Sequence, residues 1–343
     1  MIRALHQLLE GKSLSREHAA AAMCEVIEGR ATPEQVGAFL FALRIKEESV
    51  EEISGFLDCL RAKAVPFPDY PGLMDVCGTG GDSSGTFNIS TTVAFVVAAA
   101  GQPVAKHGNR SVSSRSGSFD VLEALGLRFE SDPALIARSI EEHGIGLFFA
   151  PAFHPSLKAL APIRKSLGVY TVFNALGPLL NPARVRRQLV GVYSPLLLRK
   201  AAEVLRDQGA GQGTPNTVEA LVVRGEDGLD ELSLSAPTRA VHLKAGQIRE
   251  LTITPEEHGL KRADAAHLRG GDASENARIL IEILRGEKGP KRDIVLFNAG
   301  AALWIGGKAG DIREGIERAG AAIDSGKSLA LLRKMGAHMG PKP

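Results

Sequence analysis

A glycine-rich stretch at residues 75–91, DVCGTGGDSSGTFNIST, contains the residue types that bind an anion. Glycine lets backbone amides approach a ligand closely. The apolar run 93–100 that follows predicts a helix, whose N-terminus adds unpaired N–H groups. Further donors are the hydroxyl groups of Thr79, Ser83, Thr86, Ser90 and Thr91. We therefore predict a phosphate-binding loop between a strand and a helix. A tight loop that only connects the two elements is the alternative.

A second donor-rich segment, KHGNRSVSSRSGSFDVLEALG at residues 106–126, has the same order of strand end, polar loop and helix. Lys106, Arg110 and Arg115 carry charges that pair with phosphate, and Asn109 can donate or accept a hydrogen bond. Either arginine alone would more often be a solvated surface charge. Two such loops at consecutive strand ends indicate a ligand with two separated phosphate groups.

The adjacent carboxylates Asp230 and Glu231, in EDGLDELSLS, follow another predicted strand and point to a divalent metal. A polyphosphate usually brings Mg²⁺, which binds oxygen ligands. An isolated Asp-Glu pair is usually solvated surface. At the same sheet edge as two phosphate loops, a metal-binding role is favoured.

Two histidines and one arginine are further candidates. His107 lies inside the second loop and His154 precedes Pro155, but a near-neutral pKa alone does not indicate catalysis. A structural hydrogen bond is the alternative for each, and we favour it for His154. Arg164, in HPSLKALAPIRKSLG, can hold a carboxylate in a bidentate fork, whereas Lys165 beside it is expected at the surface.

Composition and charge exclude several classes of protein. The 343-residue chain has a formal net charge of +2, which argues against nucleic acid as a partner. The start, MIRALHQLLEGK, lacks the apolar core of a signal peptide, and the run 93–100 is too short to span a membrane. Cys24, Cys59 and Cys77 suggest neither a disulfide framework nor a zinc site, so we expect a reduced, cytoplasmic protein.

The elements that must position these residues fall into two regions. Residues 3–64 predict only helices, two of which begin with the capping boxes Thr32/Gln35 and Ser49/Glu52. A proline-rich break, AVPFPDYPG, then separates them from the rest of the chain. We expect a small all-helical domain at residues 1–66.

The larger region, expected at residues 67–343, alternates short apolar strands with helices. This alternation predicts an α/β domain with a mostly parallel sheet. Residues 239–253 predict extra strands or an edge hairpin, and residues 274–329 are mostly helical in pattern.

In order and number, these motifs closely resemble those of the anthranilate phosphoribosyltransferase family, over nearly the whole chain. The segments that carry the resemblance are GTGGD, TFNIST, KHGNRSVSSRSGS, DVLEALG, APAFHP, APIRKSLG, TVFNALGPLLNP, DGLDELS and NAGAALW. It implies transfer of phosphoribose from phosphoribosyl pyrophosphate to the amino nitrogen of anthranilate, in tryptophan biosynthesis. It also implies a fold of the nucleoside phosphorylase and phosphoribosyltransferase class, in which part of about 160–185 joins the small domain.

The same resemblance implies which residues bind each ligand. Two Mg²⁺ ions would be bound by Ser90, Asp230 and Glu231, and anthranilate by Gly78, Asn109 and Arg164. The positions that match the phosphoribosyl pyrophosphate site are Gly78, Gly81, Asp82, Thr86, Asn88, Ile89, Ser90, Thr91, Lys106, His107, Gly108, Asn109, Arg110, Ser111, Val112, Ser113, Ser114 and Ser118. No general base is evident, so Lys106 and Asn109 are catalytic candidates through positioning and electrostatics. The family also implies a homodimer formed through the helical domain, and an association with anthranilate synthase stays open.

The chain departs from the family pattern at few positions. Arg115 replaces the usual Lys, Phe119 replaces Ala, Tyr170 stands where Arg is frequent, and the loop 209–217 is longer than expected. Phe119 adds bulk beside the phosphate loop, where it would shift Ser118.

Three other interpretations stay open. A pyrimidine nucleoside phosphorylase would leave KHGNR and DGLDELS unexplained. A non-catalytic paralogue would bind nucleic acid or a regulator. A duplicated enzyme of secondary metabolism would use the same chemistry.

Overall fold

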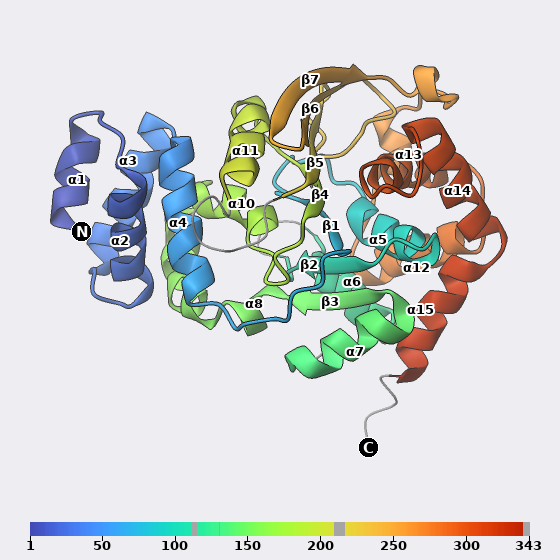
Figure 1. Ribbon diagram of the computed structural model, residues 1–343, viewed down its shortest axis with the longest axis horizontal. Coiled ribbons are helices and arrows are strands. Elements are labelled where there is room, and N and C mark those ends of the chain that lie inside the picture. The colour runs from blue at the N-terminus through green and yellow to red at the C-terminus, as the bar shows by residue number, and fades with distance from the viewer. Residues whose placement is uncertain (112–114, 130, 209–216, 339–343) are drawn as a thin grey trace.

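The computed structural model describes residues 1–111, 115–129, 131–208 and 217–338. A helical bundle at the N-terminus lies beside a seven-stranded sheet covered by helices (Figure 1). This arrangement confirms the predicted combination of a small helical domain and a larger, mostly parallel α/β domain. Within the described residues, no helix has both the length and the hydrophobicity needed to cross a membrane.

The N-terminal bundle is built from α1 (Ile2–Leu9), α2 (Arg16–Ile27), α3 (Pro33–Lys46) and α4 (Val50–Ala62). Both predicted capping boxes are present, at the starts of α3 and α4. An apolar stripe of α3 faces the core, where Val36, Phe39, Leu40 and Leu43 are buried. Capping therefore sets where these helices begin, and burial of the stripe stabilises them.

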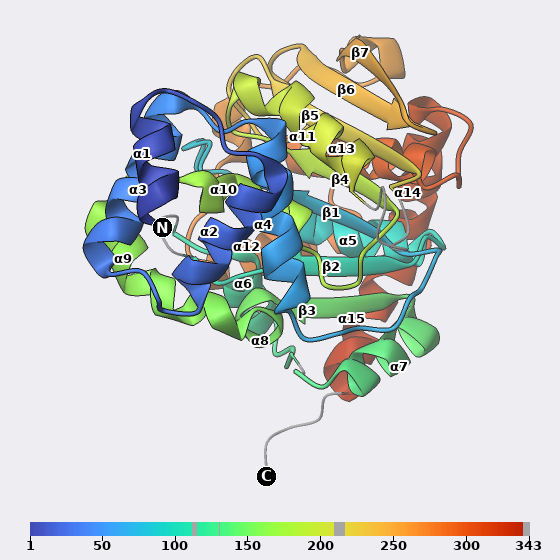
Figure 2. The same cartoon turned by 60° about the vertical axis from the view of Figure 1, so that its left-hand side comes forward.

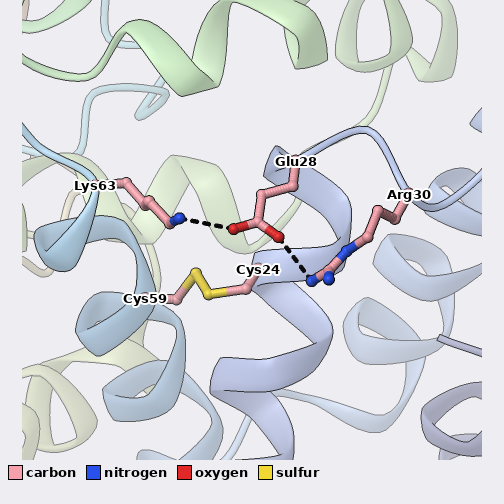
Figure 3. Close-up of a disulfide and its surroundings, with 5 residues drawn as sticks. All are labelled: Cys24, Glu28, Arg30, Cys59 and Lys63. Carbon is pink, nitrogen blue, oxygen red and sulfur yellow. Dashed lines mark ion pairs between the residues drawn. A yellow bond between two sulfur atoms is a disulfide. The ribbon is translucent and has the colours of Figure 1, made fainter.

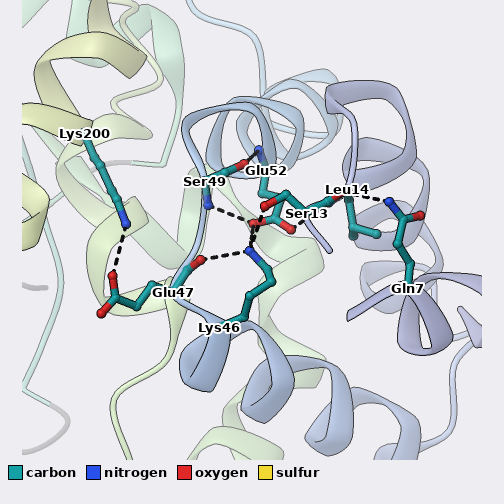
Figure 4. Close-up of polar contacts among 8 residues, drawn as sticks. All are labelled: Gln7, Ser13, Leu14, Lys46, Glu47, Ser49, Glu52 and Lys200. Atoms are coloured by element: carbon teal, nitrogen blue, oxygen red, sulfur yellow. Dashed lines mark hydrogen bonds and ion pairs between the residues drawn. The ribbon is translucent and has the colours of Figure 1, made fainter. Parts of the chain in front are cut away.

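The buried carboxylate of Glu52 does more than cap its own helix (Figure 4). Its Oε1 accepts the N–H of Leu14 at 2.9 Å, and its Oε2 forms an ion pair with Lys46 Nζ at 2.9 Å. The residue after Lys46, Glu47, forms an ion pair at 3.7 Å with Lys200 in the α/β domain. These contacts tie the α1–α2 loop and the α3–α4 turn to each other and to the neighbouring domain.

A disulfide joins Cys24 on α2 to Cys59 on α4 (Figure 3), with 5.8 Å between the two Cα atoms. The expectation that the cysteines form no disulfide is therefore wrong, and cysteine usage gives no support for a reducing compartment. The two helices approach this closely because Gly55 lies at their contact, where a Cβ would overlap the Arg16 carbonyl oxygen. The third cysteine, Cys77, is free.

The sheet has the strand order β3-β2-β1-β4-β5-β6-β7. The strands are β1 (Met74–Gly78), β2 (Val104–Gly108), β3 (Ile145–Phe149), β4 (Arg187–Gly191), β5 (Glu219–Gly225), β6 (Thr238–Lys244) and β7 (Gln247–Ile253). Strands β1–β5 pair in parallel, and β6 and β7 form the predicted antiparallel hairpin at the edge. The order changes direction between β1 and β4, which is the switch point where open α/β sheets bind ligands.

Helices cover both faces of the sheet (Figures 1 and 2). The face opposite the bundle is covered by α5 (Ile89–Ala99) and α13 (Pro290–Ile305), which pack on each other and on β1, β2 and β4. Behind them lie α6 (Ser118–Ala124), α12 (Ala273–Leu284), α14 (Ile312–Asp324) and α15 (Lys327–His338). Helix α11 (Pro195–Asp207) separates β5 and β6 from α4, and α7 (Pro133–His143) packs on β3.

After β3 the chain crosses back to the helical bundle through α8 (Ala150–Phe153), α9 (Ala161–Leu167) and α10 (Val172–Leu176). Helix α9 packs on α3, and α10 packs on α3 and α4. Leu160, Val172 and Leu176 share one buried apolar cluster with the bundle residues Phe39 and Leu57. This packing supports the predicted return of part of 160–185 to the small domain, whose boundaries stay a prediction.

Candidate active site

Asp230 lies at the switch point, between the glycines that end β1 and β4. Gly78 and Gly191 are paired in the sheet, and a Cβ on either residue would overlap Asp230. The absence of both side chains lets the loop after β5 reach the loop after β1. There Asp230 Oδ2 accepts the Gly80 N–H at 2.7 Å.

Asp230 and Glu231 are adjacent in the chain, and Asp82 approaches them from the first loop, where its Oδ2 accepts the Asp230 N–H at 3.4 Å. Burial, reinforced by the charge of Asp82, raises the pKa of Asp230 to about 7. Burial and then the charge of Asp230 raise the pKa of Glu231 well above its ordinary value. None of the three carboxylates forms an ion pair within the described residues. Keeping the buried carboxylates ionised therefore costs free energy unless a cation lies beside them.

The donor chemistry of this cluster fits Mg²⁺. The described residues contain no ready-made group of three His, Cys, Asp or Glu ligands. Mg²⁺ does not require one, because it commonly binds one or two carboxylates and completes its shell with water and substrate phosphates. Ser90, the third predicted ligand, lies at the start of α5, and its N–H donates to the Glu231 carboxylate. The three predicted ligands therefore lie together.

Lys106 lies on β2, an interior strand of the sheet, and is buried with 2% of its surface exposed. Its Nζ donates to the Val76 carbonyl oxygen at 2.7 Å and lies 3.5 Å from Ser90 Oγ. The same charge lowers the pKa of Glu231, against the larger effect of burial. Lys106 therefore contributes a buried positive charge below the first loop, near Ser90 and Glu231.

The second predicted loop is closed by Asp120 on α6. Its Oδ2 accepts the N–H groups of Ser111 at 2.9 Å and Gly117 at 2.8 Å. Ser118 Oγ donates to the Asn109 carbonyl oxygen at 3.2 Å, which fixes the other side of the loop. Val112, Ser113 and Ser114 lie outside the described residues.

Arg110 is directed away from the switch point. It pairs with Glu123 at 3.2 Å, and its guanidinium lies over the rings of Phe129 and Phe149. Phe119 is fully buried against the same two rings. Its added bulk is therefore accommodated in an aromatic cluster behind the loop.

The remaining predicted residues differ in what they can present to a ligand. Gly81, Thr86 and Asn88 lie in the loop before α5, and Gly108 ends β2. Ile89 and Thr91 are buried at 2% and 1% exposure in the first turn of α5, so neither side chain is accessible to solvent.

Arg164 lies on α9, in the segment that crosses to the bundle. Its guanidinium stacks over the Phe173 ring at 5.3 Å from the centroid, and burial lowers its pKa. Within the described residues it has no carboxylate partner. Lys165 is exposed, as expected of a surface charge.

The two candidate histidines lie edge to face, with 5.8 Å between ring centroids and 70° between ring planes. Burial, and next the charge of His154, lowers the pKa of His107 to about 3, and burial also lowers that of His154. Both are therefore neutral at pH 7. His154 Nε2 lies 2.9 Å from the Leu180 carbonyl oxygen, which supports the structural role favoured from its sequence context.

Several site residues were missed by reasoning from the sequence. Buried Asp75 accepts the Asn181 side-chain N–H at 2.8 Å, linking β1 to the segment that follows α10. Gly191 carried one usable signal, since glycine inside an apolar strand often marks a close backbone approach. Tyr170 and Tyr193 come from separate segments and stack beside the first loop, which no local pattern indicates.

Comparison with known proteins agrees with this geometry. Residues 2–64 match the model for the helical bundle domain of a glycosyl transferase family, and residues 70–329 match the model for its a/b domain. Anthranilate phosphoribosyltransferase from Symbiobacterium thermophilum is 49% identical over 96% of this chain and 95% of its own, and that from Brucella suis is 48% identical over 97% and 96%.

Solved structures give the same result. Anthranilate phosphoribosyltransferase from Thermus thermophilus is 41% identical, with a TM-score of 0.90 over 98% of this chain and 99% of its own. The enzyme from Saccharomyces cerevisiae in complex with PRPP (phosphoribosyl pyrophosphate) and Mg is 27% identical, with a TM-score of 0.87 over 98% of both chains. Shared sequence and shared fold extend over nearly the full length, so this chain belongs to the anthranilate phosphoribosyltransferase family.

Proposed function

We propose that the protein transfers phosphoribose from PRPP to the amino nitrogen of anthranilate, giving N-(5-phosphoribosyl)anthranilate and pyrophosphate in tryptophan biosynthesis. The observation that carries the proposal is the pair of buried carboxylates, Asp230 and Glu231, opposite the amide-rich loop at the switch point. The test is the loss of anthranilate fluorescence on mixing the protein with PRPP and Mg²⁺. Fluorescence that stays constant in the complete mixture would contradict the proposal.

The reaction breaks the bond between ribose C1 and the pyrophosphate oxygen. Mg²⁺, of which we propose two ions at Ser90, Asp230 and Glu231, would neutralise the charge that develops on the leaving group. The N–H groups of the loop after β1 provide fixed donors for the same charge, and Lys106 adds a positive charge from beneath. Because the donors are already in place, little reorganisation is needed as the bond breaks.

The attacking group is an aromatic amine, which is neutral at pH 7 and needs no strong base. Holding it against ribose C1 supplies much of the acceleration, since fixed geometry contributes on the order of 7–11 kcal/mol. The neutral, buried state of His107 and His154 is compatible with a reaction that does not use them as bases. We place the acceptor between Asn109 and Arg164.

Replacing Arg164 by Ala should raise the KM for anthranilate while leaving the KM for PRPP nearly unchanged. The planar guanidinium forms two parallel hydrogen bonds to a carboxylate, and a hydrogen bond to a charged group contributes about 1.5–3 kcal/mol, or roughly 10- to 100-fold in KM. Steady-state kinetics with both substrates varied would measure this, with Lys165→Ala as the control. A normal KM in Arg164→Ala would move the carboxylate contact elsewhere, with Asn109 as the next candidate.

We also propose a homodimer formed through α1 and α3. These helices pack together and expose Ile2, Leu9, Phe41 and Ile45 at 59%, 77%, 55% and 71%. Phe41 and Ile45 are four residues apart and therefore lie on one face of α3. An apolar surface of this kind is typical of an interface between subunits.

Sedimentation should show a dimer for the wild type and a monomer for Phe41→Glu/Ile45→Glu. The double variant Leu135→Glu/Leu196→Glu, which changes exposed residues outside α1 and α3, should remain dimeric. A monomeric wild type would contradict the dimer and leave this face available to anthranilate synthase.

A cytoplasmic location is likewise proposed from the pathway alone.

A further inference from the structure

Tyr170 links the segment that crosses to the bundle with the first anion loop. It lies between α9 and α10, and its hydroxyl donates to the Gly81 carbonyl oxygen at 3.1 Å. Its ring stacks on Tyr193, which follows β4, with 5.3 Å between centroids and 24° between planes. The Tyr193 N–H in turn donates to Thr79 Oγ1 at 3.0 Å. Two aromatic rings thus join three segments beside the loop.

The loop after β1 has a glycine where the Tyr170 ring contacts its backbone. Gly81 has φ +78°, a conformation that L side chains rarely adopt, and a Cβ there would lie 2.9 Å from Tyr170 Cε1. A residue with a side chain would have to displace the Tyr170 ring. Glycine at this position therefore serves the contact with Tyr170 as well as the turn.

The hydrogen bond to Gly81 controls the direction of a neighbouring donor. In a planar trans peptide, the carbonyl oxygen of Gly81 and the N–H of Asp82 point to opposite sides. With the oxygen held by Tyr170, the Asp82 N–H must point away from Tyr170. On the other side of Gly81, the Gly80 N–H is held by Asp230 Oδ2 at 2.7 Å. Within the described residues, the N–H groups of Gly81 and Asp82 have no acceptor.

We propose that Tyr170 is a positioning residue for the pyrophosphate end of PRPP, an inference that rests on the proposed function. Its hydroxyl holds the Gly81–Asp82 peptide so that the unpaired Asp82 N–H faces the phosphate and the Gly81 carbonyl oxygen faces away. The unpaired N–H of Gly81, in the preceding peptide, lies beside it. Successive N–H groups around left-handed glycines form an anion-binding concavity of this kind. Without the hydroxyl the peptide can rotate, which replaces a donor by the partial negative charge of a carbonyl oxygen.

The variant Tyr170→Phe keeps the aromatic stack and removes only the hydrogen bond. It should raise the KM for PRPP and the Kd for pyrophosphate with Mg²⁺ by about 3- to 10-fold, the range for one neutral hydrogen bond. The KM for anthranilate should not change. Tyr70→Phe is the matched control, because Tyr70 also loses a hydroxyl hydrogen bond, to Glu141 at 2.9 Å, but at a site far from the loop. Both variants should unfold at the same midpoint within error.

Calorimetric titration with pyrophosphate and Mg²⁺ separates this inference from the proposed function, since it requires no turnover. Absence of anthranilate consumption by the wild type would contradict the proposed function only. Equal pyrophosphate affinities in wild type and Tyr170→Phe, or no pyrophosphate binding by the wild type, would overturn the role of Tyr170. A rise in both substrate KM values together with a lower unfolding midpoint would show a structural role instead.

Discussion

Asp230→Asn and Glu231→Gln should each lower kcat/KM by about 100-fold or more. Each variant would bind the metal more weakly or in a shifted position, and the metal's stabilisation of the leaving group supplies a large share of the acceleration. Both carboxylates are buried without an ion pair in the described structure, so a bound cation would stabilise the ionised form of each. Kinetics over a range of Mg²⁺ concentrations should show that more metal is needed for half-maximal activity.

The matched control for these variants is Glu226→Gln, an exposed carboxylate in the same loop, which should leave activity unchanged.

The affinity for Mg²⁺ should also depend on pH. Since the pKa of Asp230 is raised to about 7, protons compete with the metal, and the apparent affinity of the wild type for Mg²⁺ should fall as the pH drops from 8 to 6. Normal activity and metal dependence in both carboxylate variants would rule out the assignment.

Gly191→Ala should abolish most of the activity and also destabilise the fold. Its Cβ would overlap the backbone of Asp230, which cannot move aside as a flexible side chain does. Overpacking typically costs about 1–3 kcal/mol. A displacement of the carboxylates by about 1 Å is enough for a loss on the order of 100-fold in rate. Urea unfolding and steady-state kinetics on one preparation would measure both effects.

Gly72→Ala provides the comparison, because Gly72 precedes the same sheet and a Cβ there meets no atom within 4 Å. It should be as active and as stable as the wild type. If Gly191→Ala behaved like Gly72→Ala, the close approach of Asp230 to the ends of β1 and β4 would not be required for activity.

Much of the architecture could be predicted because it depends on local patterns. The caps at Thr32 and Ser49, the alternation of strands and helices and the edge hairpin each leave a signal within a few residues. The apolar run that begins at Leu189 predicts a strand starting there, whereas β4 starts two residues earlier with the polar residues Arg187 and Gln188. They belong to the strand through pairing with β1 and β5, which apolar runs do not reveal.

The site was predicted in part for a related reason. The donor-rich loops after β1 and β2 and the acidic loop after β5 are visible in the sequence, and parallel pairing brings the ends of these strands to one edge of the sheet. Contacts between distant segments were not visible. The stack of Tyr170 on Tyr193 and the Cys24–Cys59 disulfide depend on how helices and loops pack after the sheet has formed.

The shared core of the helical bundle has a consequence for synthesis of the chain on the ribosome. The first four helices are complete by residue 62, yet the apolar cluster that buries them includes Leu176, Leu179 and Leu180 from the crossing segment. At 5–20 residues per second, the ribosome needs roughly 6–23 s to add residues 65–180. During that interval the nascent helices lack part of their final apolar cover, and this is the period in which a chaperone that binds exposed apolar helices would find its substrate.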